Sequence, residues 1–95
     1  MRYEWDDNKN RANKAKHGIS FETASLVFDD PVHLSMQDRH EGGEERWRTL
    51  GLVNGVVILI VVHTFRKDDT GKEVLRIISA RKATAHERKR YEQGI

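Results

Sequence analysis

The sequence predicts an α+β fold in which two short helices precede a four-stranded antiparallel sheet and one helix follows it. The strongest observation is the run of residues 56–66, which is apolar and β-branched at most positions, as a strand buried on both faces is. A second run, residues 74–81, follows the turn residues Asp68-Asp69-Thr70-Gly71, so the two runs are predicted to form a hairpin. Helix-capping signals lie before and after the strands.

Length and composition indicate one small domain, residues 1–95, with a modest core. Because 34% of the residues are charged and 37% are hydrophobic, most of that core must come from the hairpin and its neighbours. The absence of cysteine excludes a disulfide framework and a cysteine-ligated zinc site. The apolar run is shorter than the roughly 20 residues that cross a membrane. Since Arg2-Tyr3-Glu4-Trp5 is not a secretory leader, we expect a cytoplasmic protein.

Charge is distributed unevenly along the chain. Residues 1–60 carry 8 Lys and Arg against 10 Asp and Glu, and residues 61–95 carry 9 against 5. The basic excess therefore lies on the second strand of the hairpin and on the tail. This pattern suits a local phosphate-binding face, although a solvated arginine-rich surface would look the same.

The N-terminal part predicts a strand or arm followed by a helix. Residues 1–5 could form a short edge strand or an extended arm. Asp6 or Asp7 can cap a helix over residues 8–17, and Gly18 supplies a left-handed stop. Basic residues that favour the helix dipole fall near its end, namely Lys14, Lys16 and His17. With few large apolar residues, this helix is expected at the surface.

The second helix is predicted after Ser20, a good N-cap, and spans little more than one amphipathic turn. It ends at Asp29-Asp30-Pro31, because the residue before proline avoids the helical region.

Two further strands complete the predicted sheet. Residues 32–37 read as a strand, residues 38–43 as a polar turn, and residues 44–53 as a half-exposed strand with alternating side chains. Asn54-Gly55 is a strong type I′ hairpin signal, so residues 44–53 should pair with the central strand, residues 56–66.

The last helix is predicted from a capping box, in which Thr84 and Glu87 satisfy each other's backbone, to about residue 93. Its only apolar residues are Ala85 and Tyr91, so it buries little against its own sheet. It could be solvated or could bind a partner.

The register of the central hairpin decides which side chains share a face. If the loop at residues 67–73 closes symmetrically, His63 lies opposite Ile77 and Thr64 opposite Arg76. Alternation then gives two sets, one of Thr64, Arg66 and Arg76 and the other of His63, Phe65, Ser79 and Arg81. A slip of one residue would mix the sets.

Several segments match a known family. They are Trp5-Asp6 with Lys9-Asn10, Lys16-His17-Gly18-Ile19-Ser20-Phe21, Val27-Phe28-Asp29-Asp30-Pro31 and Glu44-Glu45-Arg46, then Gly51, Thr64 with Arg66, Arg76-Ile77-Ile78-Ser79-Ala80-Arg81-Lys82-Ala83-Thr84, Glu87-Arg88 and Tyr91. In these the chain resembles, over essentially its whole length, the BrnT toxins of bacterial type II toxin–antitoxin pairs. The resemblance implies a RelE-like fold and an endoribonuclease that blocks translation. It also implies neutralisation by a BrnA-type ribbon-helix-helix antitoxin in a 2:2 complex, which binds operator DNA through the antitoxin.

Arginines are the side chains best suited to such chemistry. When the 2′-hydroxyl of RNA attacks the adjacent phosphate, the hydroxyl must be activated, the added charge stabilised and the leaving 5′-oxygen protonated. A planar guanidinium binds phosphate at two points and keeps its charge. The candidate catalytic arginines are Arg66, Arg76 and Arg81, and the candidate RNA-binding residues are Arg46, Arg48 and Lys82. The alternative is ion pairing with Glu44, Glu45 or Glu87.

Two further catalytic candidates have structural alternatives. His63 ends a buried strand and could shuttle protons, although a packed histidine is the more ordinary reading. Tyr91 could stack on a base or anchor the last helix to the sheet. His86 fits a surface role, and Glu44 and Glu45 could supply a general base or pair with arginine.

Other site classes have little support in the sequence. The five histidines show no metal-ligand spacing, and no glycine-rich phosphate loop precedes a helix, so we expect no cofactor and a metal-independent reaction. A toxin endoribonuclease and a non-catalytic module that binds RNA, the ribosome or a protein both fit. The ends of the RNA products would discriminate between them.

Overall fold

The protein is built on a five-stranded mixed sheet, seen in a computed structural model that describes residues 1–94 apart from the side chains of residues 39–41. The strands are β1 (Arg2–Glu4), β2 (Leu34–Glu41), β3 (Glu44–Val53), β4 (Val57–Lys67) and β5 (Glu73–Lys82). Their order across the sheet is β1-β5-β4-β3-β2, so the apolar strand β4 is central, as predicted. Leu59, Ile60 and Val61 at its middle are each at most 2% exposed.

The prediction of a purely antiparallel four-stranded sheet is wrong in one respect. β1 adds a fifth strand, which pairs parallel to β5 through Arg2 and Val74, Tyr3 and Leu75, and Glu4 and Arg76. Three residues are too few to show an alternating pattern, so the sequence left an edge strand and an extended arm as alternatives. The pairing places Glu4 beside Arg76, which matters for the site described below.

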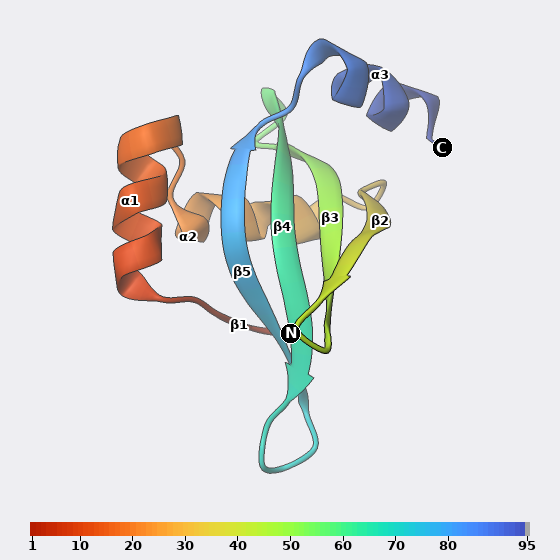
Figure 1. Ribbon diagram of the computed structural model, residues 1–95. Coiled ribbons are helices and arrows are strands. Elements are labelled where there is room, and N and C mark those ends of the chain that lie inside the picture. The colour runs from red at the N-terminus through yellow and green to blue at the C-terminus, as the bar shows by residue number, and fades with distance from the viewer. Residues whose placement is uncertain (95) are drawn as a thin grey trace.

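Four helical segments surround the sheet (Figure 1). They are α1 (Asp7–His17), α2 (Phe21–Ala24), the 3₁₀ segment η1 (Ser25–Asp29) that continues α2, and α3 (Ala85–Gln93). Figure 1 shows α1 beside β5, α2 and η1 across one face of the sheet, and α3 at the end away from the β4–β5 loop. None of the helices within residues 1–94 is long and apolar enough to cross a membrane.

The predicted caps and tight turns are confirmed. The Asp6 side chain accepts a hydrogen bond from the backbone N–H of Lys9 at the start of α1, and Gly18 ends that helix at φ 74°. The capping box of α3 is formed by Thr84 and Glu87. Asn54 and Gly55 have φ of 55° and 68°, as a type I′ turn requires.

β2 begins at Leu34 and ends at Glu41, whereas the predicted strand covered residues 32–37. It runs to Glu41 and leaves only Gly42 and Gly43 in the turn, because its polar residues continue the ladder with β3 across a register shift after Gln37. An edge strand tolerates such polar residues, and the sequence pattern therefore placed the turn too early.

The main core lies between the sheet and the α2–η1 segment. Phe21, Ala24 and Val27 from the helical side pack against a set of sheet residues that includes Val61, Leu75 and Ile77. η1 approaches β3 closely because position 51 is glycine. A Cβ atom there would lie 2.6 Å from Cγ1 of Val27.

α1 is attached to the sheet by a polar latch that the sequence did not predict. Asn13 is buried, and its side-chain amide donates to the carbonyl oxygens of Ile19 and Ala80 at 2.9 and 2.8 Å. Its side-chain oxygen accepts from the N–H of Ala80 at 3.2 Å. The helix therefore has a fixed position against β5 despite its few apolar residues.

A β-bulge in β5 corrects the predicted division of side chains between the two faces. His63 pairs with Ile77 and Thr64 with Arg76, as predicted, but Val62 pairs with Ser79, so Ile78 is an extra residue. C-terminal to the bulge, every side chain of β5 lies on the face opposite to the predicted one. Ser79 and Arg81 therefore lie on the face of Thr64 and Arg76, and the prediction that placed them with His63 is wrong.

Candidate functional site

The face of the sheet away from α2 and η1 carries most of the candidate arginines. Strand pairing and alternation place Arg48, Arg66, Arg76 and Arg81 on it, and we call this surface the arginine face. Part of it is covered by a small apolar cluster of Leu50, Ile60 and Ala83, against which Tyr91 of α3 packs. Arg46 shares this face by alternation along β3.

A cavity of about 380 Å³ opens on the arginine face where the C-terminal end of α1 reaches β5. Its lining residues are Lys16, His17, Arg48, Ile60, Val62, Ser79, Ala80 and Arg81. Arg48 and Arg81 were predicted as site residues, and the fold brings them together here. Among the described residues, the lining contains no carboxylate, so the cavity suits an anionic ligand.

Lys16 and His17 line this cavity and were missed as site residues. The sequence placed them correctly at the end of α1, but only as residues that favour the helix dipole. Their position beside β5 depends on the buried Asn13 latch, and an isolated asparagine in a polar helix gives no signal of it.

Arg81 is held by α3. Its guanidinium donates to both carboxylate oxygens of Glu87, with Nη1–Oε1 and Nη2–Oε2 distances of 2.8 and 3.0 Å. These hydrogen bonds are the largest cause of a Glu87 pKa lowered to about 2. Glu87 also accepts from the N–H of Thr84 at 2.8 Å, so the capping box and the arginine share one carboxylate. This is the Glu87 ion pair that the sequence offered as an alternative.

Arg66 and Arg76 form a second group around Glu4 of β1. Arg66 donates from Nε and Nη2 to the two oxygens of Glu4 at 2.7 and 2.6 Å, and Arg76 donates from Nη1 at 3.3 Å. The hydrogen bond to Arg66 is the largest cause of a Glu4 pKa lowered to about 2. The sequence missed this partner because it left the pairing of β1 open. Arg48 has its own carboxylate, with Nε 3.3 Å from Oδ1 of Asp38.

His63 lies on the opposite face of β4 from these arginines. It is 1% exposed, and its Nε2 is 2.7 Å from Oγ1 of Thr49. The rings of Phe28 and Phe65 meet it edge-on at centroid distances of 5.0 and 5.2 Å. Burial lowers the His63 pKa to about 4, so the imidazole is neutral near neutral pH. This position fits the alternative in which His63 is a packed structural histidine.

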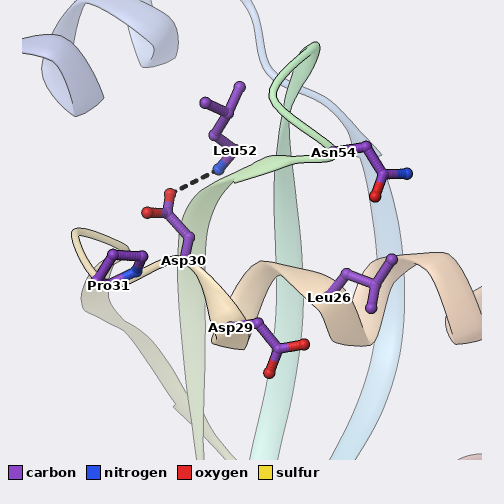
Figure 2. Close-up of a pocket in the computed structure, with 6 residues that line it drawn as sticks. All are labelled: Leu26, Asp29, Asp30, Pro31, Leu52 and Asn54. Atoms are coloured by element: carbon purple, nitrogen blue, oxygen red, sulfur yellow. Dashed lines mark hydrogen bonds between the residues drawn. The ribbon is translucent and has the colours of Figure 1, made fainter.

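Tyr91 ties α3 to the body of the protein. Its hydroxyl donates to Oδ2 of Asp30 at 2.5 Å, and the same oxygen accepts from the N–H of Leu52 at 2.8 Å, a bond drawn in Figure 2. The hydrogen bond to Asp30 is the largest cause of a Tyr91 pKa raised to about 12. The anchoring alternative for Tyr91 therefore fits the structure.

A second hollow, of about 330 Å³, lies beside that anchor (Figure 2). It is lined by Leu26, Asp29, Asp30, Pro31, Leu52 and Asn54. Its two carboxylates repel a phosphate. Unlike the cavity on the arginine face, this hollow is therefore a poor site for an anion.

The remaining candidates lie outside the cavity lining. Lys82 pairs with the core residue Leu59, so it belongs to the helix-covered side of the sheet, where it is exposed at the end of β5. His86 is exposed on α3, and Glu44 and Glu45 are exposed at the start of β3. Among the side chains that the structure describes, no three His, Asp or Glu residues gather as a metal site.

Comparison with known proteins decides the family. Residues 5–87 match the family described as the ribonuclease toxin, BrnT, of type II toxin–antitoxin systems. The chain belongs to the BrnT family. A crystal structure of the Brucella abortus ribonuclease toxin BrnT is similar, with a TM-score of 0.67 and 27% sequence identity over 88% of this chain and 97% of that one. No curated protein sequence matches the chain.

Membership in the BrnT family confirms the resemblance read from the sequence, and the protein is a ribonuclease toxin of a type II toxin–antitoxin system. The matched residues contain every side chain that lines the cavity and also Glu87. Glu4 and Tyr91 lie outside the match.

Proposed function

We propose that this BrnT toxin is a metal-independent endoribonuclease of the cytoplasm, which cleaves RNA by in-line attack of a 2′-hydroxyl on the adjacent phosphate and so inhibits translation. The observation that carries the proposal is the cavity on the arginine face, whose lining combines Arg48, Arg81, Lys16 and His17 with no carboxylate. Guanidinium groups can stabilise the charge added to phosphorus in the transition state.

The arginines take two positions in this proposal. Arg81 and Arg48 contact the phosphate that reacts, since both line the cavity. Arg66 and Arg76, which gather around Glu4, contact a neighbouring phosphate of the same strand. Arg46 and Lys82 are peripheral RNA contacts. Because His63 is buried on the other face and Tyr91 is bonded to Asp30, both are given structural roles.

The reaction is tested through its products. Purified toxin is incubated with RNA in the presence of EDTA, and the ends of the fragments are mapped. In-line attack leaves a 2′,3′-cyclic phosphate on one fragment and a 5′-hydroxyl on the other. Fragments with a 5′-phosphate, or cleavage that stops in EDTA, would contradict the mechanism. RNA that is bound but left intact would show a non-catalytic binding module instead.

The proposed partner is a BrnA-type ribbon-helix-helix antitoxin in a 2:2 complex, with operator DNA bound through the antitoxin. The helices α1 and α3 support this, because each presents a largely polar surface and their buried residues are limited to Asn13. Cationic side chains beside the cavity favour an acidic segment of the partner. Co-expression with the neighbouring gene tests the idea: a stoichiometric complex that restores growth supports it, and toxicity indifferent to that gene contradicts it.

A further inference from the structure

The cavity on the arginine face contains an imidazole that none of the roles above uses. His17 is the only histidine among the described side chains that lines this cavity. His33 bonds the carbonyl of Asp30 through Nδ1 at 2.7 Å, His63 is buried on the opposite face, and His86 is exposed on α3. The arginines of the cavity can bind a phosphate, but they keep their protons near neutral pH and cannot transfer one.

The fold holds His17 in a fixed place. It is the last residue of α1, followed by Gly18 at φ 74°, whose N–H donates to the carbonyl of Lys14 at 2.8 Å. One turn earlier, Asn13 is bonded to both backbone groups of Ala80, which itself lines the cavity. The half-buried imidazole is therefore positioned relative to β5 by a rigid connection and not by a loop.

The charges around His17 change when a phosphate enters. Lys16 from its own helix, Arg48 from β3 and Arg81 from β5 line the cavity with it, and Asp38 and Glu87 lie behind the two arginines. A phosphate bound in the cavity brings negative charge among these three cations, next to the imidazole.

We propose that His17 is the general acid of the reaction, an inference that rests on the proposed function. The 2′-hydroxyl gives its proton to water, the bond between the 2′-oxygen and phosphorus forms, and the bond between phosphorus and the 5′-oxygen breaks. The imidazolium N–H of His17 gives its proton to the departing 5′-oxygen, which leaves a 5′-hydroxyl, a 2′,3′-cyclic phosphate and a neutral imidazole. Lys16 fills this role less well, because an ammonium loses its proton far above neutral pH.

A sulfur leaving group tests this assignment. Two RNA oligonucleotides are compared, one with an ordinary cleavage site and one in which sulfur replaces the bridging 5′-oxygen, because a thiolate departs without a proton. The His17→Gln variant is expected to cleave the ordinary RNA about a hundredfold or more slowly than the unaltered toxin. On the sulfur substrate the two proteins should differ by only about twofold. The Arg81→Ala variant serves as the control and should be slow on both substrates.

Three outcomes would overturn the assignment. If His17→Gln slows both substrates equally, the imidazole does not protonate the leaving group, and if it slows neither, the imidazole is not used. If the unaltered toxin cleaves neither substrate, the proposed reaction fails and the assignment with it. His17→Asn provides a second variant, and melting curves of both variants show whether they fold.

Discussion

On the arginine face, Arg48, Arg66, Arg76 and Arg81 each contact a carboxylate of the same chain. Arg81 contacts Glu87, Arg66 and Arg76 share Glu4, and Arg48 contacts Asp38. These carboxylates hold the guanidinium groups in place, and an RNA phosphate must compete with them for the same donors. The positions of the guanidinium groups are therefore fixed, and the carboxylates cancel part of the positive potential of the face.

Among these arginines, Arg81 is the one for which the structure predicts the largest catalytic effect. The Arg81→Ala variant removes a bidentate donor from the cavity and should reduce RNA cleavage about a hundredfold, which corresponds to about 3 kcal/mol of transition-state stabilisation. Cleavage rates of purified proteins measure this. Lys72→Ala, in the exposed β4–β5 loop, is the matched control and should cleave normally. Unchanged cleavage by Arg81→Ala would place the reaction elsewhere.

Acidification should destabilise the fold through Glu87 and Glu4. Because the folded pKa of each is lowered to about 2 from 4.5, the stability that their arginine pairs contribute is complete above pH 4.5 and is lost as the pH falls from 4.5 toward 2. The Glu87→Gln variant keeps a capping side chain but cannot titrate. Its melting temperature should therefore fall less than that of the unaltered chain over this range.

Glu92→Gln, a change at an exposed position of the same helix, is the control for that experiment and should melt as the unaltered chain does at each pH. Equal acid sensitivity of the Glu87→Gln variant and the unaltered chain would show that the Glu87 pair does not carry the effect.

At the scale of elements, α3 is attached to the rest of the fold through a few side chains that are not fully buried. It has no buried residue, and its contacts with the rest of the chain include the Arg81–Glu87 pair, the packing of Tyr91 on the apolar cluster and the Tyr91–Asp30 hydrogen bond. Two of these depend on Tyr91. Tyr91 therefore helps to position α3, and the first turn of α3 holds Arg81 through Glu87.

Removing one hydroxyl tests this anchor. The Tyr91→Phe variant keeps the ring on the apolar cluster but loses the hydrogen bond to the Asp30 carboxylate, and it should lower the free energy of unfolding by about 1–3 kcal/mol. Chemical denaturation measures the change. Lys89→Ala, at an exposed position of α3, should have little effect. A Tyr91→Phe variant as stable as the unaltered chain would mean that the hydroxyl contributes nothing and that α3 is held by its first turn and by the packing of the ring.

The elements that the sequence predicted well are those with local signals. Asp6 and Gly18 mark the ends of α1, Asn54-Gly55 marks a turn, and Thr84 with Glu87 marks the start of α3. The parallel pairing of β1 and the bulge at Ile78 have no such signal, because both depend on contacts between distant segments. The same limit applies to the site. The candidate arginines could be named from residue type, but the cavity with Lys16 and His17 exists only once Asn13 fixes α1 against β5.

At the scale of the whole molecule, the arginine face and the hollow beside the Tyr91 anchor differ in charge. Among the described side chains, five arginines from three strands lie on the arginine face, whereas the hollow beside the Tyr91 anchor carries Asp29 and Asp30. The net charge of the chain is only +2, so attraction of RNA comes from the placement of the charges and not from their sum. RNA should therefore approach the protein in one orientation, with its backbone along the arginine face.

This orientation predicts a specific salt dependence. If the arginines of the face neutralise two phosphates of a single strand, the reacting one and its neighbour, the logarithm of the association constant should fall with the logarithm of salt concentration. The slope should be about −1.4, at about 0.7 per neutralised phosphate. Binding of a non-cleavable RNA with 2′-O-methyl groups, measured from about 50 to about 200 mM salt, gives the slope. Arg66→Ala should make the slope shallower by up to about 0.7, because Arg66 lies outside the cavity lining and shares the neighbouring phosphate with Arg76. Lys72→Ala should leave the slope unchanged. Tight binding with a slope near zero, or a slope indifferent to Arg66, would mean that RNA is held by another surface.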